Sequence, residues 1–446
     1  MAGGEPARKT RLRRASEPPG GLTGRSAASR RLPTYLGGKW HLGHEPGSLP
    51  FDRGFERSFS MLVGGASHWS DMLGILPMDD PAKYSLNGKL LESLPADFYS
   101  SRSYADFLMD AIRENRGDGK PFLAYLSFTA VHDPVHVPEP WLSKYRGQYD
   151  EGYEVLKARR WQAAKDAGIV PQEAQLADRD PMIRPWDELN DEERAREVKG
   201  MEVYAGMLDA MDYHYGRVVD FLKDIGEFEN TVIIFISDNG ANAWYSEEYP
   251  DADTPEFRNQ FDYSTENIGN PGSNHAYGIG FASGSGGPLD KFKMTVSEGG
   301  IRVPLLIAGP GIQNGHQSDA FNYVRDVLPT ILDMAAVEYP AEFNGHKVQA
   351  PRGRSMKGLL YGSSNAIYAD DEFVGGEMGG GKWMRQGDFK ATMIPRPYGT
   401  NTWKLFNLAV DPGDANDLAA AMPGKLETLK AAWDKYAADV GVIPAE

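Results

Sequence analysis

The chain has 446 residues, no cysteine, and 63 acidic against 47 basic residues, which gives a formal net charge of -16. This length allows one large domain with a smaller appendage, or two comparable domains. The acidic balance argues against a nucleic-acid partner, which would need a basic face, and the absence of cysteine excludes disulfides, thiolate metal sites and cysteine nucleophiles. An anionic ligand would therefore need a local cationic pocket.

The first 31 residues differ from the rest of the chain. They hold eight basic and two acidic residues, no aromatic residue and no hydrophobic periodicity. This composition predicts a disordered segment, which we expect to be foreign to the fold.

No apolar run is long enough to cross a bilayer, and none follows the charged N-terminus as in a signal peptide. As written, the sequence predicts a cytoplasmic protein without membrane contact, and it does not specify an oligomeric state.

Two early segments carry candidate polar groups. Glycines surround Lys39 and His41, which indicates backbone packed closely against a site. Residues 121–128 predict a buried strand, and it is followed by His132, a candidate acid or base. His136 lies between two valines and before a proline, and its role is left open between catalytic and structural.

A run of five apolar residues in the middle of the chain leads directly into polar residues. Residues 199–223 predict an amphipathic helix, and residues 232–236 predict an interior strand of a parallel sheet, covered on both faces. Asp238 and Asn239 follow that strand at its C-terminal end, where open α/β sheets bind their ligands. The same pair could also be an ordinary strand-to-loop turn.

The remaining segments complete an α/β prediction. Helices are predicted over residues 103–115, 326–336 and 425–440, and strands over 305–308, 383–393 and 403–408. We expect a catalytic domain over residues 32–365 and a small α+β subdomain over residues 366–446.

Two irregular stretches interrupt this pattern. Residues 141–196 are charged and rich in aromatic side chains, and we expect an insertion on the substrate side. Residues 241–290 are rich in glycine, serine and asparagine, and loops of this length are usually functional. Lys293 follows them as either a substrate-binding cation or a solvated surface charge.

Five separated motifs, in this order, resemble those of the sulfatases. They are Gly38-Lys-Trp-His-Leu-Gly43, Thr129-Ala-Val-His132, Ser237-Asp-Asn-Gly240, Lys293 with Gly299-Gly-Ile-Arg-Val-Pro304, and Arg385-Gln-Gly-Asp388 with Asn407-Leu408 and Asp411-Pro-Gly413. One such match would be weak, whereas five in order are specific. The resemblance is closest to the bacterial arylsulfatases of the alkaline phosphatase superfamily, and it runs from Tyr35 almost to the end. It implies an alkaline-phosphatase-like central sheet, mostly parallel and flanked by helices, with a small C-terminal antiparallel sheet plus helix.

The resemblance implies hydrolysis of a small-molecule sulfate ester. Lys39 and His41 would hold the nucleophile and the sulfate oxygens, while His132 and Lys293 would face the leaving group and the sulfate. Two lysines and a divalent cation would neutralise charge on a transferring sulfuryl group, and a histidine can protonate the departing oxygen.

The resemblance also implies calcium and a formylglycine, and here the chain departs from the family. Asp238 and Asn239 would supply oxygen ligands to one calcium ion, but no adjacent acidic pair precedes Lys39. Formylglycine is made from Cys or Ser in a Cys/Ser-x-Pro/Ala-x-Arg motif. Residues Ser26 to Arg30 match this motif literally, but they lie too close to Lys39 for the helix and strand that the family places between them.

We therefore expect that the family's N-terminal portion, with its first strand and nucleophile, is missing, that calcium binds weakly and that hydrolysis is low or nil. A sheet without that strand would expose unpaired backbone and apolar faces, which lowers solubility or favours association. Two alternatives remain. A phosphatase or phosphodiesterase of the same superfamily would bind a similar tetrahedral anion, and a non-catalytic sulfatase-like remnant would bind an anion or partner without turnover.

Overall fold

The computed structural model describes residues 32–114, 119–343 and 345–444. The disorder predicted for residues 1–31, and with it Ser26, lies outside the described residues. None of the described helices combines the length and apolar character that crossing a bilayer requires.

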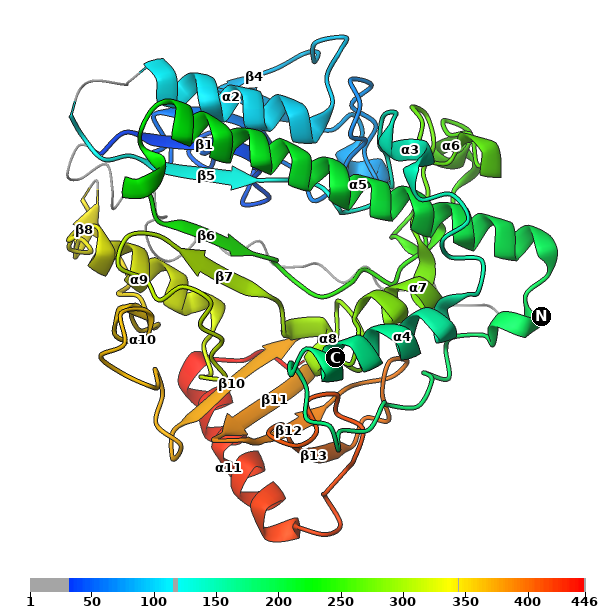
Figure 1. Cartoon of the computed structure of the whole chain (residues 1–446), viewed down its shortest axis with the longest axis vertical. Helices are drawn as coiled ribbons and strands as arrows, with labels where there is room; N and C mark the ends of the chain where they lie inside the picture. The colour runs from blue at the N-terminus through cyan, green and yellow to red at the C-terminus, as the bar shows by residue number, and fades with distance from the viewer. Residues whose placement is uncertain (1–31, 115–118, 344, 445–446) are drawn as a thin grey trace, which may run out of the picture.

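A five-stranded mixed sheet, in the order β4-β3-β2-β1-β5, organises the N-terminal part of the molecule (Figure 1). Its centre is β1 (Thr34–Lys39), which pairs in parallel with β2 (Arg57–Met61) and with β5 (Leu123–Ser127). The antiparallel strands β3 (Tyr84–Leu86) and β4 (Lys89–Leu90) complete one side. The glycine-rich segment around Lys39 is therefore a buried central strand.

Two long helices pack beside this sheet (Figure 1). The first, α2 (Ser100–Glu114), confirms the helix predicted at 103–115, and it buries Tyr104 and Leu108 against the sheet. The second, α5 (Asp191–Asp224), contains the predicted helix 199–223 but begins earlier. Its start is fixed by a capping box, in which the Asn190 side chain accepts from the backbone of Glu193 and the Glu193 carboxylate accepts from the backbone of Asn190.

The prediction for residues 232–236 is wrong in partner and in burial. The strand β6 (Ile233–Ile236) pairs antiparallel with β7 (Leu305–Ala308), in a two-stranded sheet separate from the parallel strands. None of the residues of β6 is buried, and Ile236 and Leu306 are 36% and 60% exposed. A run of apolar residues indicates a strand that can be buried. Whether it is buried depends on which other elements pack against it, and the run itself does not specify these elements.

The burial predicted for residues 121–128 is also wrong. Every residue of β5 is half-buried or exposed, and Tyr125 is 49% exposed. Within the described residues β5 pairs only with β1, and β6 only with β7, so each keeps one edge without a strand partner. Unpaired edges with apolar side chains favour association. The predicted self-association therefore has a structural basis and stays a prediction.

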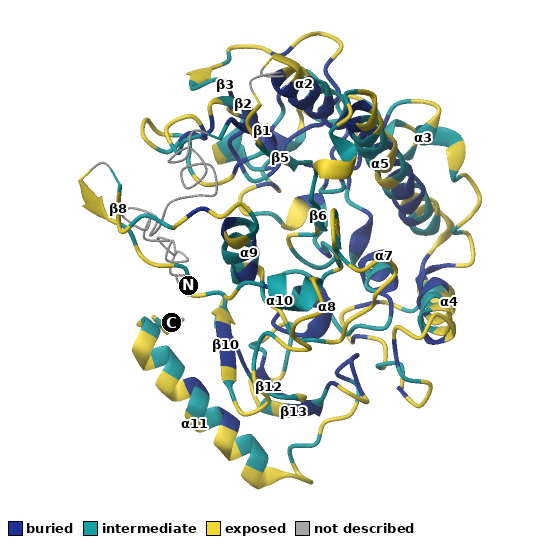
Figure 2. Cartoon of the chain, turned by 60° about the vertical axis from the view of Figure 1, so that its left-hand side comes forward, coloured by how far each residue is buried: buried dark blue, intermediate teal, exposed yellow. Residues whose placement is uncertain are grey.

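The C-terminal subdomain is a four-stranded antiparallel sheet with a helix against it. Its elements are β10 (Phe373–Met378), β11 (Gly381–Gln386), β12 (Phe389–Met393), β13 (Trp403–Asn407) and α11 (Pro423–Val440). Figure 2 shows α11 with exposed residues along its outer face. The strand predicted at 383–393 is in fact a hairpin, because Gly387 adopts a φ of 55° and turns the chain between β11 and β12.

Shorter elements connect these parts. They are α3 (Trp141–Lys144), α4 (Tyr153–Asp166), α6 (Pro255–Arg258), α7 (Gly278–Ser285), α8 (Glu298–Ile301), α9 (Val327–Met334), α10 (Lys357–Leu360), β8 (Glu342–Phe343) and β9 (His346–Lys347). Three aromatic side chains of the segment predicted as a substrate-side insertion pack in the core, and the role of the segment towards a substrate stays a prediction. Tyr149, Tyr153 and Trp186 all pack edge-on against Phe281, with ring centroids 5.6 to 6.1 Å from it.

Candidate active site

Lys39 is the last residue of β1, and its position is fixed by the neighbouring strand. The hydroxyl of Ser127, at the end of β5, donates to the Lys39 carbonyl at 2.7 Å. A Cβ atom on Gly38 would lie 1.8 Å from the Ser127 carbonyl oxygen, and Gly38 has a φ of 129°. Only glycine fits this approach. The glycine next to Lys39 therefore sets where the lysine leaves the sheet.

Lys293 and His132 are in direct contact. The Lys293 Nζ atom lies 3.1 Å from Nε2 of His132, and the Lys293 backbone is held by its amide donating to the Ala241 carbonyl at 2.9 Å. The other ring nitrogen of His132, Nδ1, lies 2.8 Å from the Asp133 carbonyl oxygen and 3.2 Å from its carboxylate. Two acceptors at Nδ1 place the ring proton there. The Nε2 lone pair then accepts from the Lys293 ammonium.

The Asp133 carboxylate is itself held in place. Asp133 is 1% exposed, and its two oxygens accept from Asn242 Nδ2 at 2.8 Å and from the Tyr249 hydroxyl at 2.9 Å. This gives a chain from two loop residues through Asp133 to His132. The sequence analysis missed these positioning residues. Asp133 could have been suspected, since an acid directly follows the candidate histidine and such a base is commonly oriented by a third group.

His41 joins the same cluster through two neighbouring glycines. A Cβ atom on Gly64 would lie 2.9 Å from Cε1 of His41, and one on Gly65 would lie 3.3 Å from Cε1 of His132. The two imidazole rings therefore lie against consecutive glycines just after β2. Larger side chains at these positions would displace one or both rings.

Burial and like charge shape the electrostatics of the cluster. Burial, then the nearby Lys293 ammonium, lowers the pKa of Lys39, while Asp238 and Asp133 oppose the change. Burial also lowers the pKa of His41, with Lys39 acting in the same direction. For His132, burial lowers the pKa to about 4, with the two lysines adding to the effect and Asp133 opposing it. His132 is therefore neutral at pH 7.

The predicted calcium ligands give an incomplete donor set. Asp238 is exposed near the lysine pair, and Asn239 is beside it with its amide donating to the Gly240 carbonyl at 2.9 Å. Calcium takes six to eight oxygen ligands, whereas these two residues offer two side chains. The described ranges contain no group of three or more His, Asp or Glu side chains placed to hold a metal. Asp238 and Asn239 therefore do not form a calcium site by themselves.

His136 is structural. It is fully buried, its Nε2 lies 2.9 Å from the Ser273 carbonyl, and its Nδ1 lies 3.3 Å from the backbone nitrogen of His68. His68 in turn contacts the carbonyl of His132 through Nε2 at 3.0 Å. This network supports the loop that carries His132 without reaching the lysines.

Known proteins match most of this chain. The sulfatase family model matches residues 28–337. An uncharacterized sulfatase of Schizosaccharomyces pombe is 38% identical over 421 residues, covering 92% of this chain and 76% of that protein. An arylsulfatase of Klebsiella aerogenes is 36% identical over 307 residues, covering 68% of this chain and 65% of that protein.

Solved structures show the same fold. The crystal structure of Ps i-CgsB matches with a TM-score of 0.61 at 20% identity, covering 93% of this chain and 74% of that one. The fold is thus the alkaline-phosphatase-like architecture, with parallel strands flanked by helices and a small C-terminal antiparallel sheet plus helix. The family model and the relatives of higher identity establish that this chain belongs to the sulfatase family.

Proposed function

We propose that Lys39, His132 and Lys293 bind the sulfate group of a small-molecule ester, and that the chain is a sulfuric ester hydrolase with low turnover. The observation that carries this proposal is the 3.1 Å contact between Lys293 Nζ and His132 Nε2, with Asp133 behind the ring. Two ammonium groups beside a neutral histidine form the local cationic pocket that a chain of net charge -16 needs for an anion.

Each side chain has a physical role in this proposal. The Lys39 and Lys293 ammonium groups neutralise charge on the sulfate oxygens, and they do so most strongly as that charge grows during transfer. The negative charge of a bound sulfate ester raises the pKa of His132 and so favours its protonated ring. The Lys293–His132 pair can then donate a proton to the oxygen of the leaving group. Asp133 keeps Nε2 directed at the substrate by holding Nδ1.

Three features support low turnover. The chain contains no cysteine, and its serine match to the formylglycine motif, Ser26 to Arg30, lies too close to Lys39 for the helix and strand that the family places between them. Among the described residues, no serine or threonine hydroxyl makes a hydrogen bond to the side chain of Lys39, His132 or Lys293. Asp238 with Asn239 leaves most of a calcium coordination sphere to other groups. Binding therefore relies on the lysines more than on a metal.

The test compares matched aryl esters. Binding and hydrolysis of 4-nitrophenyl sulfate and 4-nitrophenyl phosphate are measured on the wild type, on Lys293→Met and on Lys404→Met, an exposed lysine of the C-terminal sheet that serves as control. We expect the sulfate ester to bind better than the phosphate ester. Lys293→Met should weaken this binding by roughly ten-fold or more, because an interaction with a charged partner is lost, and Lys404→Met should not. Equal binding by the wild type and Lys293→Met would overturn the site.

A second outcome concerns turnover. Hydrolysis at rates typical of the family, abolished by Ser26→Ala, would overturn the proposed low activity. Measurable sulfate binding by calorimetry with no hydrolysis would instead favour the non-catalytic remnant, which the incomplete calcium donor set also favours. Hydrolysis of the phosphate ester in preference to the sulfate ester would favour the phosphatase alternative.

A further inference from the structure

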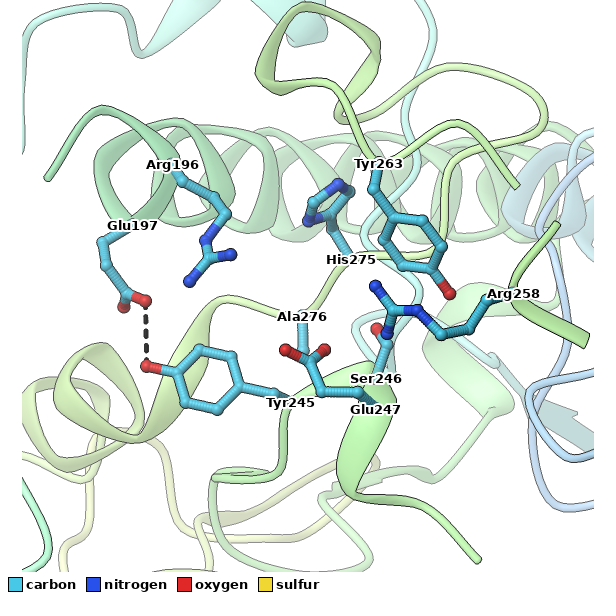
Figure 3. Close-up of a pocket in the computed structure, with 9 residues that line it drawn as sticks. All are labelled: Arg196, Glu197, Tyr245, Ser246, Glu247, Arg258, Tyr263, His275 and Ala276. Atoms are coloured by element: carbon cyan, nitrogen blue, oxygen red, sulfur yellow. Dashed lines mark hydrogen bonds between the residues drawn. The ribbon is translucent and has the colours of Figure 1, made fainter. Parts of the chain in front are cut away.

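A second polar pocket lies apart from the lysine cluster, between the first turns of α5 and the loop that follows β6 (Figure 3). Its volume is ≈ 50 Å³. A cavity needs about 10–15 Å³ on this measure to hold one water, so the pocket has room for a few waters or for one small ion. Its walls come from α5, from the end of α6 and from the loop segments around residues 246 and 275.

Two arginines reach into this pocket, the exposed Arg196 and the half-buried Arg258. In Figure 3 the guanidinium groups of Arg196, on α5, and Arg258, at the end of α6, extend towards the middle of the pocket from opposite sides. Among the described residues, neither guanidinium makes a hydrogen bond or ion pair, and Arg258 only lies over the Tyr263 ring at 4.3 Å. Arginine presents a planar fork of donors that matches carboxylate, sulfate or phosphate oxygens. Two unpaired forks around one small space therefore favour an oxyanion.

The inner wall of the pocket carries buried polar atoms that also lack partners. Ser246 and His275 are 3% and 7% exposed, and both line the pocket. Within the part of the chain that the structure describes, the Ser246 hydroxyl and the His275 Nε2 atom have no hydrogen-bond partner. Buried polar atoms are rarely left unpaired in folded proteins, because the loss of water is not compensated. A bound oxyanion would accept from the Ser246 hydroxyl and compensate that loss, whereas burial lowers the pKa of His275 to about 4, so its ring is neutral and donates no charge to the site.

One exposed carboxylate limits the positive charge. Glu247 lies at the exposed side of the pocket, between the two arginines in Figure 3, but it forms no ion pair with either of them among the described residues. Glu197 is turned aside by the Tyr245 hydroxyl, which donates to it at 2.8 Å, and its burial raises its pKa to about 7. Glu247, and Glu197 in its ionised fraction, are the groups that would repel an arriving anion.

We propose that this pocket is a second anion-binding site, in which Arg196, Arg258 and Ser246 bind one small oxyanion of the carboxylate or sulfate type. The site adjoins the proposed sulfate-ester site through shared loops. The His275 carbonyl accepts from the backbone nitrogen of Val135, and the loop that carries Ser246 also carries Asn242, which binds Asp133. The oxyanion is either a free ion or a second anionic group of the sulfate ester. The second possibility rests on the function proposed above, because it requires the ester to be bound at the lysine cluster.

The first experiment counts sulfate sites by equilibrium binding of radiolabelled inorganic sulfate. Three variants are compared with the wild type. The arginine pair is the double variant Arg196→Gln/Arg258→Gln, and the lysine pair is the double variant Lys39→Met/Lys293→Met. The control is Arg159→Gln, which changes an exposed arginine of α4. We expect two sites in the wild type and in Arg159→Gln. The arginine pair should weaken one site by ten-fold or more and leave the other unchanged. The lysine pair should weaken the sulfate site at Lys39 and Lys293 and leave the arginine pocket unchanged. The absence of one site can therefore be told from the absence of the other.

A gain of binding separates a ligand site from a purely structural role. Glu247→Gln removes the exposed carboxylate between the arginines and should tighten sulfate binding at the pocket several-fold, while urea unfolding curves show whether each variant is folded. A structural role for the arginines predicts no gain. Sulfate isotherms that are identical for the wild type, the folded arginine pair and Glu247→Gln would overturn the proposal.

A last arm identifies the source of the anion. A sulfated monosaccharide is compared with the same sugar extended by one uronic acid. If the extension tightens binding and the arginine pair removes only that gain, the pocket holds the second anionic group of an ester. If the extension has no effect while inorganic sulfate still occupies the pocket, the occupant is a free oxyanion.

Discussion

Replacing Lys293 with methionine should raise the pKa of His132. The ring is now held at about 4, first by burial and then by positive charge from Lys293 and Lys39 against the opposing Asp133 carboxylate. Methionine keeps much of the lysine's apolar stem and removes its charge. The hydrogen bond from Lys293 to Nε2 acts in the same direction as the charge, because it is made to the neutral ring.

The distance between the two groups sets the size of this effect. Two unit charges 4 Å apart interact by roughly 1 kcal/mol in water and by roughly 4 kcal/mol at an effective dielectric constant of about 20. Lys293 Nζ is 3.1 Å from the ring, and the His132 side chain is 13% exposed, so the interaction falls between these limits. Since one pH unit corresponds to about 1.4 kcal/mol, the pKa of His132 should rise by roughly one to three pH units.

The assay is a pH titration of the histidine ring resonances by NMR. The chain has nine histidines, and His132→Gln identifies the signal of interest by its disappearance. Lys404→Met, on the C-terminal sheet, should leave the His132 titration unchanged. A His132 pKa that stays at about 4 or falls in Lys293→Met would refute the reasoning, since the lysine would then not act on the ring.

Three further predictions concern stability and association. In the folded protein Glu197 keeps its proton up to about pH 7, whereas in the unfolded chain it loses the proton near pH 4.5. The free energy of unfolding should therefore fall by up to about 3 kcal/mol as the pH rises from 4.5 to 7. Urea titrations at several pH values should show this fall in the wild type and not in Glu197→Gln. Gly38→Ala should prevent folding, as seen by circular dichroism, because its Cβ would meet the Ser127 carbonyl, while Gly47→Ala, with a φ of 85° but open space around it, should fold. Leu306→Lys should reduce self-association in sedimentation experiments, and an unchanged sedimentation profile would contradict the role assigned to the open edges.

Short local patterns in the sequence indicated the candidate site residues, whose roles stay predictions. Lys39 lies among glycines that a close strand approach requires, and His132 and Asp238 each follow an apolar strand. Such local signals identify candidate residues. They do not predict contacts between distant residues. The contact of His132 with Lys293 depends on the path of the long loop after β6, which no local pattern specifies.

What escaped prediction depends on distant parts of the chain. Asn242 and Tyr249 hold Asp133 from a loop without periodicity, so no pattern marks them. The five apolar residues leading into Asp238 indicated an interior strand, but no local feature showed that β6 would pair only with β7. The turn at Gly387 could have been anticipated, because a glycine between Gln386 and an aspartate is a common turn signal.

The most direct test of the central claim is a crystal soaked with selenate, a sulfate analogue whose anomalous signal locates it without ambiguity. The account predicts an anomalous peak within hydrogen-bond distance of the Lys39 and Lys293 ammonium groups, beside His132, that disappears when both lysines are replaced by methionine. Absence of a peak at that position in wild-type crystals, or a peak that survives both replacements, would contradict it.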